Sequence, residues 1–132
     1  MKPLIFFDMT RNLILVFLGG GAGSICRYAI SLWLSKYKAV FFGLPAHTLL
    51  ANILGCFVIG LATGYLSKYE SNWIPLLLVS GFCGGFTTFS TFSLEMLDML
   101  RNGQTLLAVT YMAISVIICI AAVYAGFALL KN

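Results

Sequence analysis

The residues best suited to chemistry lie in one stretch, GFCGGFTTFSTFSLE, which runs from Gly81 to Glu95. Glycine has a low helix propensity and threonine is β-branched, so the pairs at 84–85 and 87–88 predict a break in a helix. Inside a membrane, such a break is tolerated only where the freed backbone is buried in protein or lines a cavity. Freed carbonyls and hydroxyls are hard oxygen ligands that suit a cation.

A row of phenylalanines accompanies this predicted break. Phe86, Phe89 and Phe92 recur every three residues, and packing is the ordinary interpretation of such a row. The edge of an aromatic ring carries partial positive charge. Ring edges turned inward could therefore stabilise a small anion without binding it too tightly to leave. Thr91 and the serines beside it place hydroxyls next to the rings, so both interpretations stay open.

Two further pairs of polar residues lie in otherwise apolar segments. Thr48 and Asn52 are one helical turn apart, and so are Tyr111 and Ser115. An asparagine amide in lipid must be satisfied, either by joining helices together or by lining a polar path. A serine can bond its own helix backbone, so Ser115 alone is a weak indication of a path.

Ionisable groups inside membrane spans are candidates for functional sites. Arg27 either extends its side chain to the interface or places a fixed positive charge at the mouth of an anion path. Glu95 and Asp98 are one turn apart and near Arg101, which favours ion pairing at the end of a helix. His47, the single histidine, is predicted to lie at the interface and to have no catalytic role.

The elements that must position these residues follow from composition. The chain is 61% hydrophobic and 9% charged, with a mean hydropathy of +0.99, whereas about a quarter of the residues in a soluble domain are charged. We therefore predict an all-α, multi-pass protein of the cell membrane, forming a single domain over residues 1–132. Its four predicted spans are about 13–34, 48–66, 74–100 and 106–130.

Positive charges are almost evenly divided between the two sides of the membrane. One side holds Lys2, Arg11, Lys68 and Lys131, and the other holds Lys36, Lys38 and Arg101, with Arg27 nearer the second side. A clear excess of positive charge on one side normally fixes the orientation of a membrane protein. Because this chain has almost no such excess, it either inserts in both orientations or has its orientation fixed by a few well-placed charges. A lone bundle of this size fills its own centre, so a pathway is expected between subunits. The simplest closed assembly of two orientations is an antiparallel dimer.

Several other classes of function are disfavoured. The basic residues form no stripe that would bind nucleic acid. The four cysteines lie far apart and lack the spacing of metal ligands. No nucleophile–base pair indicates an enzyme.

Three segments together are similar to a known family. They are GGGAGSICRY in the first span, TLLANILGCFVIG in the second and GFCGGFTTFSTFSLE in the third. In this order and in a chain of this length, they closely resemble the CrcB/Fluc fluoride channels. The G-x-x-G-G-x-T-T-F-S-T-F pattern is highly specific, and the motif positions show no clear departure from it.

The resemblance implies an antiparallel, dual-topology homodimer with two fluoride pathways and passive export of fluoride that entered the cell as HF. It also implies a central structural sodium ion, bound by the backbone carbonyls of Gly84 and Thr87. The implied pathway residues and their neighbours are Phe89, Phe92, Asn52, Ser115, Tyr111, Arg27 and Glu95. Thr48 and Thr91 add hydroxyls that can replace the water around a strongly hydrated anion, which ionised carboxylates cannot do.

The rival class is a small multidrug antiporter, which also has about four short spans with balanced charge. Such an antiporter needs a carboxylate deep in the membrane to exchange protons for cationic drugs. The first span here contains Arg27 and no acidic residue, which argues against that class.

Overall fold

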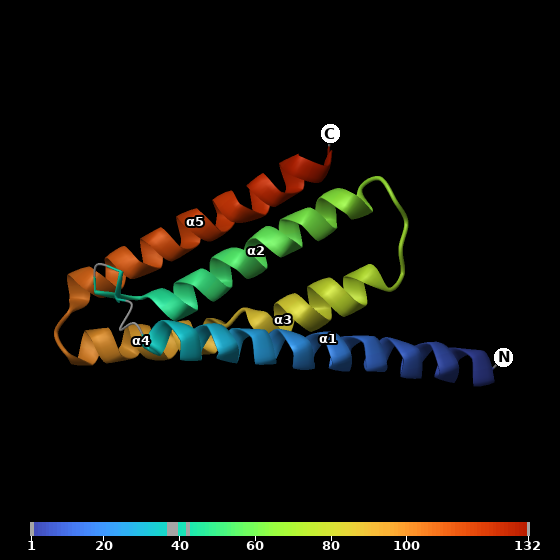
Figure 1. Ribbon diagram of the computed structural model, residues 1–132, viewed down its shortest axis with the longest axis horizontal. Coiled ribbons are helices and arrows are strands. Elements are labelled where there is room, and N and C mark those ends of the chain that lie inside the picture. The colour runs from blue at the N-terminus through green and yellow to red at the C-terminus, as the bar shows by residue number, and fades with distance from the viewer. Residues whose placement is uncertain (1, 37–39, 42, 132) are drawn as a thin grey trace.

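The computed structural model is an elongated bundle of helices that cross from one end of the molecule to the other (Figure 1). It describes the backbone of residues 2–36, 40–41 and 43–131, and the side chains of residues 8–34 and 43–131. The elements in chain order are α1 (Lys2–Lys36), β1 (Val40–Phe41), β2 (Leu44–Pro45), α2 (Ala46–Leu66), η1 (Pro75–Cys83), α3 (Gly84–Phe86), α4 (Phe89–Arg101) and α5 (Thr105–Lys131).

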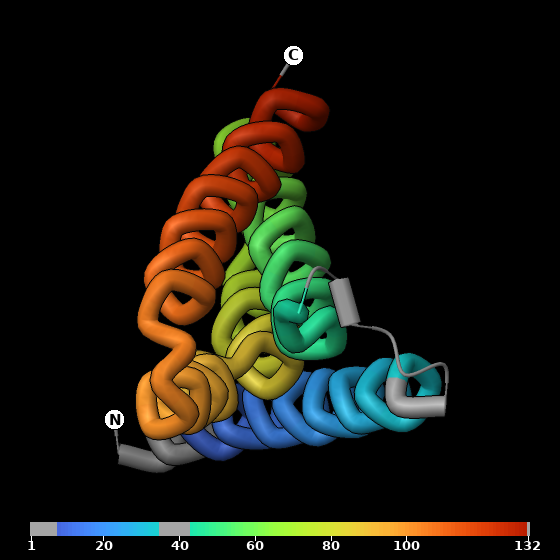
Figure 2. The backbone as a smooth tube through the Cα atoms, turned by 90° about the vertical axis from the view of Figure 1, so that its left-hand side faces the viewer, coloured from blue at the N-terminus to red at the C-terminus, as the bar shows by residue number. Residues whose placement is uncertain are grey.

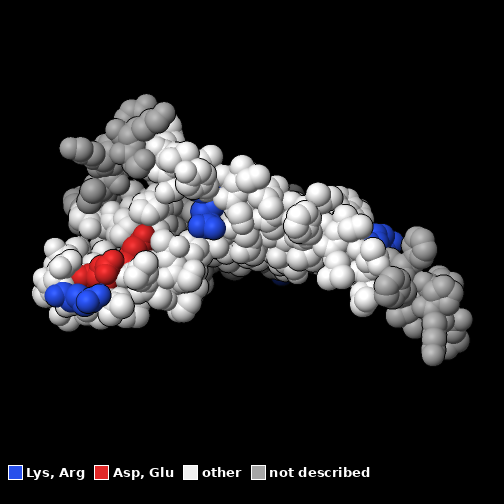
Figure 3. All heavy atoms as spheres, turned by 90° about the horizontal axis from the view of Figure 1, so that it is seen from below, with Lys and Arg blue, Asp and Glu red and all other residues white. Residues whose placement is uncertain are grey.

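Four helical segments are long and apolar enough to cross a membrane. They are Asp8–Leu34, Ala46–Leu66, Pro75–Arg101 and Thr105–Lys131. Charged side chains are sparse on the face in Figure 3, where most of the described surface carries neither positive nor negative charge. A continuous apolar surface is what lipid requires, so the four-span organisation expected from composition is confirmed.

The first helix is longer than predicted, because it begins at Lys2 and not near residue 13. Asp8 and Arg11 interrupt the apolar run, yet the helix continues through them, because charged residues are compatible with helical backbone. Their side chains approach to 3.8 Å at i,i+3 spacing, which is compatible with an exposed helical turn. Lys38, which entered the charge tally, lies outside the described residues, as do the side chains of Lys2 and Lys36.

The helices pair in a definite order. Figure 2 places α1 and α5 on opposite sides, with α2 and the third span between them. The helix α1 packs against η1 and α3, while α2 packs along α5. The first turn of α1 and the last turn of α5 lie toward one end of the bundle, and the α4–α5 turn lies at the other (Figure 1).

Glycines set how closely these helices approach. A Cβ atom at Gly19 or Gly23 would collide with the backbone of the third span, and one at Gly60 would collide with the backbone of α5. A Cβ atom at Gly21 would meet no atom within 4 Å. Close packing against the third span therefore needs a glycine at positions 19 and 23, but not at Gly21.

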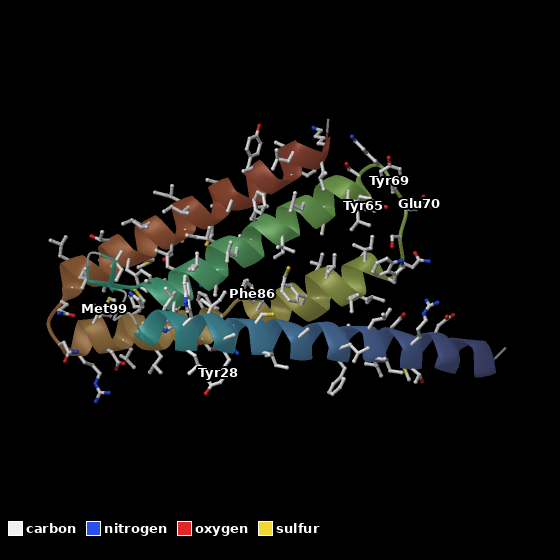
Figure 4. The ribbon with its side chains drawn as sticks, viewed as in Figure 1. Tyr28, Tyr65, Tyr69, Glu70, Phe86 and Met99 are labelled. Atoms are coloured by element: carbon white, nitrogen blue, oxygen red, sulfur yellow. The ribbon has the colours of Figure 1, made fainter. Side chains whose placement is uncertain are left out.

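A small core lies at the end of the bundle that holds the α4–α5 turn. The short β1–β2 hairpin turns at Gly43, where φ is +83°, and delivers Leu44 into this core. The buried residues of the cluster are Leu44, Leu49, Met99, Ala108 and Tyr111. Figure 4 labels Met99 at this end. The core holds α2, α4 and α5 in register, which positions the polar groups described next.

Candidate functional site

The third span changes conformation between α3 and α4. Thr87 has φ −80° and ψ 159°, and Thr88 has φ −150° and ψ 111°, so both residues are extended. The Asn52 side chain of α2 bonds this segment: its Oδ1 accepts from the Thr88 amide at 2.8 Å, and its Nδ2 donates to the Thr88 carbonyl at 3.4 Å. Asn52 therefore satisfies backbone groups that a continuous helix would satisfy itself.

The extended segment deprives two carbonyls of their usual donors. In a continuous helix the Gly84 carbonyl would accept from the Thr88 amide, and the Thr87 carbonyl from the Thr91 amide. The Thr88 amide instead donates to Asn52, and the Thr91 amide donates to Thr88 Oγ1 at 3.1 Å. Gly84 is also exposed on the surface of the protomer. These oxygens fit the ligand set that the resemblance implies for a monovalent cation.

Arg27 of α1 reaches α3, directly before the extended segment. Its Nε donates to the Gly85 carbonyl at 3.2 Å, and Ser24 Oγ donates to the same oxygen at 3.4 Å. The side chain is partly buried. Of the two interpretations of Arg27, the geometry favours a positive charge fixed beside the extended segment, because the interface interpretation does not account for this backbone contact.

Glu95 lies at the centre of a polar cluster formed by α2, α4 and α5. Its side chain is 14% exposed, and one oxygen lies 3.3 Å from His47 Nε2. Thr48 Oγ1 donates to the same oxygen at 2.5 Å, and Tyr111 Oη donates to the other at 2.8 Å. The two pairs noticed in the sequence, Thr48 with Asn52 and Tyr111 with Ser115, thus each contribute one hydroxyl to this carboxylate.

The predicted pairing of Glu95 with Arg101 is wrong. Among the described side chains, the ion pairs join Arg11 to Asp8 and His47 to Glu95. Glu95 projects from α4 toward α2 and α5 instead of along its own helix. Spacing within one helix cannot reveal this direction, because it depends on how α4 is rotated against its neighbours.

The phenylalanines do not form a single row. Phe86 is 5% exposed and stacks on Phe82 with ring centroids 5.3 Å apart, and it lies on the side of α3 that faces α2 (Figure 4). The ring of Phe92 lies between two others. Its centroid is 5.9 Å from that of Phe89 and 5.0 Å from that of the buried Tyr111 ring. The extended residues separate Phe86 from the other two, so the packing interpretation holds for Phe86.

Two members of the candidate site are incompletely enclosed or satisfied within the protomer. Phe89 is 81% exposed, although it is next to a partly buried ring. Ser115 is 8% exposed, and its hydroxyl has no hydrogen-bond partner among the described residues. Ser115 thus does not bond its own helix backbone, a possibility that the sequence left open, whereas Thr87 and Ser93 do bond the carbonyl four residues earlier. A free hydroxyl inside a membrane span is available to a ligand.

Sequence reasoning missed two residues of this site. His47 lies beside Glu95, and Ser24 donates to the Gly85 carbonyl. The first had a local signal, since His47 immediately precedes Thr48, which was itself a candidate. The second had none, because 61 positions separate the partners.

Comparison with known proteins places the chain in a family. The family described as "CrcB-like protein, Camphor Resistance (CrcB)" matches residues 14–127. A protein of Flavobacterium psychrophilum is 39% identical over 92% of this chain and 98% of its own length. A protein of Leptospira interrogans is 40% identical over 95% of this chain and 98% of its own length. A protein of Serratia proteamaculans is 43% identical over 81% of this chain and 84% of its own length. Each of the three is named a fluoride-specific ion channel, which describes a transport protein and not an enzyme. This chain, a multi-pass protein of the cell membrane, therefore belongs to the CrcB-like family.

Proposed function

We propose that this protein is a fluoride-selective ion channel, through which fluoride leaves the cell passively, so that cytoplasmic fluoride stays low. The observation that carries the proposal is the buried Ser115 hydroxyl, one helical turn from Tyr111, which has no hydrogen-bond partner in the described part of the chain. Fluoride is small and strongly hydrated, so a pathway must replace its water with hydrogen-bond donors. The names of the relatives support the choice of ion.

The donors and rings have distinct roles in this proposal. Asn52 places one N–H on the Thr88 carbonyl, and its amide nitrogen has a second N–H to offer. Ser115 and Thr91 offer hydroxyls, while Phe89 and Phe92 turn ring edges toward the anion. Multiple weak contacts suit conduction, because an ion that binds too tightly does not leave.

Glu95 has an indirect role in the proposal. Its oxygens receive the hydroxyl hydrogens of Thr48 and Tyr111, so these two hydroxyls point at the carboxylate. Thr48 and Tyr111 therefore shape one end of the pathway, and the carboxylate keeps their orientation fixed. Arg27, held on the Gly85 carbonyl, supplies positive charge near the middle of the chain's third span.

Fluoride flux from liposomes tests the proposal. Vesicles that contain purified protein are expected to release fluoride at least about a hundredfold faster than chloride, because chloride is larger and fits the same donors less well. An ion-selective electrode measures each anion after a potassium ionophore clamps the voltage. Protein-free vesicles are the control. Equal release of the two anions, or release no faster than from protein-free vesicles, would refute a fluoride-selective channel.

We propose further that the working unit is an antiparallel homodimer formed by chains of both orientations. The near balance of charge supports this, as does the 81% exposure of Phe89, since so exposed a ring cannot enclose an ion within one protomer. A second copy laid across the same face would complete the wall of the pathway.

Labelling from each side of the membrane tests the two orientations. Asn72→Cys and Gln104→Cys, made separately in a background without the four native cysteines, place a thiol in the second and third connections. Each thiol is expected to react with an impermeant reagent from both sides, in about equal amounts. Reaction of Asn72→Cys from one side only and of Gln104→Cys from the opposite side only would rule out dual insertion.

We propose in addition that the chain binds the structural sodium ion that its resemblance implies. The carbonyls of Gly84 and Thr87 would hold the ion, and two copies of the extended segment at a two-fold axis would supply four neutral oxygens. Four neutral dipoles suit a monovalent cation, whereas a divalent ion usually recruits carboxylates. When bound, sodium supplies a positive charge that holds the two segments together.

A further inference from the structure

His47 lies at the outer edge of the Glu95 cluster. It is the second residue of α2, beside the connection that joins α2 to the first span, and its side chain is 41% exposed. Its Nε2 atom is 3.3 Å from a Glu95 oxygen, and Glu95 is only 14% exposed. A proton from water can therefore reach His47, while the carboxylate behind it is largely covered.

The charge of the cluster depends on the state of this histidine. Thr48 and Tyr111 donate neutral hydroxyls to Glu95, so they hold the carboxylate without cancelling its charge. Histidine is the side chain that ordinarily changes charge near neutral pH. His47 is thus the cluster member whose protonation changes the charge that an approaching anion meets.

The described residues place few other ionisable groups near the cluster. On α4, Asp98 and Arg101 follow Glu95 by about one and two turns, and both are exposed. On α5 the group is Tyr111, and on α2 it is His47 itself. On α1 the nearest described cation is Arg27, which is bound to the Gly85 carbonyl. Among these described groups, His47 is the one that lies 3.3 Å from the carboxylate and can gain a positive charge.

We propose that His47 controls the admission of fluoride by its protonation, a proposal that rests on the fluoride pathway proposed above. With His47 neutral, the Glu95 charge repels an anion at this end of the pathway. With His47 protonated, the cation beside Glu95 cancels that charge and the repulsion disappears. Fluoride flux therefore rises as the pH falls through the range in which histidine is protonated.

A pH profile of flux tests the proposal. Vesicles that contain the intact protein, buffered to the same pH on both sides, are expected to release fluoride about three- to tenfold faster at about pH 5.5 than at about pH 8. Equal buffering matters because chains of both orientations would place His47 at each face. Release from protein-free vesicles at each pH is subtracted, since HF crosses lipid unaided at low pH.

Two variants separate charge from packing. His47→Gln keeps a hydrogen-bonding group beside Glu95 but cannot be protonated, so its flux should stay at the wild-type alkaline level at every pH. His47→Lys carries a charge throughout, so its flux at about pH 8 should rise by about three- to tenfold, to the acidic level of the wild type. Glu70→Gln, in the connection between α2 and η1, is the matched control and should keep the wild-type profile.

The outcomes distinguish this inference from the function on which it rests. A wild-type profile independent of pH would overturn it, and so would a His47→Gln protein, eluting as the wild type does on size exclusion, that retains the wild-type profile. Either result leaves the channel function standing. Absence of fluoride flux at every pH would instead overturn the channel function, and the role of His47 with it.

Discussion

Phe92→Ile is expected to lower fluoride flux at least about tenfold while leaving the protein folded, and Phe89→Ile should have a similar effect. Phe92 lies between Phe89 and Tyr111, so its ring bridges the exposed surface and the buried cluster. Isoleucine is of comparable bulk and apolar, but it lacks the positive ring edge that would face the anion. The substitution therefore removes the electrostatic contact and leaves most of the packing.

The matched control for this experiment is Phe17→Ile. Phe17 is 77% exposed on α1, close to the 81% of Phe89, and both would meet lipid or a partner in the membrane. Its substitution should leave flux within about twofold of the wild type, as is usual for surface positions. Flux is measured with the fluoride electrode, and folding by size exclusion in detergent. Unchanged flux in both pathway variants would reduce these rings to packing residues.

Removal of sodium from both sides of the membrane is expected to reduce fluoride flux at least about tenfold and to lower thermal stability in detergent. The reason is the pair of carbonyls at Gly84 and Thr87, whose usual amide donors bond Asn52 and Thr88 instead. Without a cation, these oxygens lack a strong partner, and two such segments facing each other would repel. A bound ion that favours the folded state raises its stability in proportion to the logarithm of ion concentration.

The sodium experiment compares sodium with a large organic cation at the same ionic strength. Potassium is a second comparison, because neutral carbonyls select between monovalent ions by the size of the site. Thermal unfolding gives a readout that does not depend on flux. Identical melting temperatures and identical flux with and without sodium would show that the extended segment has another purpose.

The sequence alone determined the membrane character and the number of spans. Composition decides both, because transfer from water to lipid depends on the apolar area of each segment and needs no knowledge of its neighbours. The unusual stretch from Gly81 to Glu95 could also be located from local chemistry. The extended residues Thr87 and Thr88 fall within it, where glycine pairs and β-branched residues weaken a helix.

Only the tertiary structure decided which partner each polar group has. Glu95 bonds Thr48, 47 positions away, and not the nearby Arg101. Asn52 bonds the backbone of Thr88, and Arg27 bonds that of Gly85, at separations of 36 and 58 positions. Periodicity gives the face on which a side chain lies, but a contact also depends on the rotation and axial position of the opposing helix. Those two quantities are set by glycine contacts such as Gly23 with the third span, which no single segment contains.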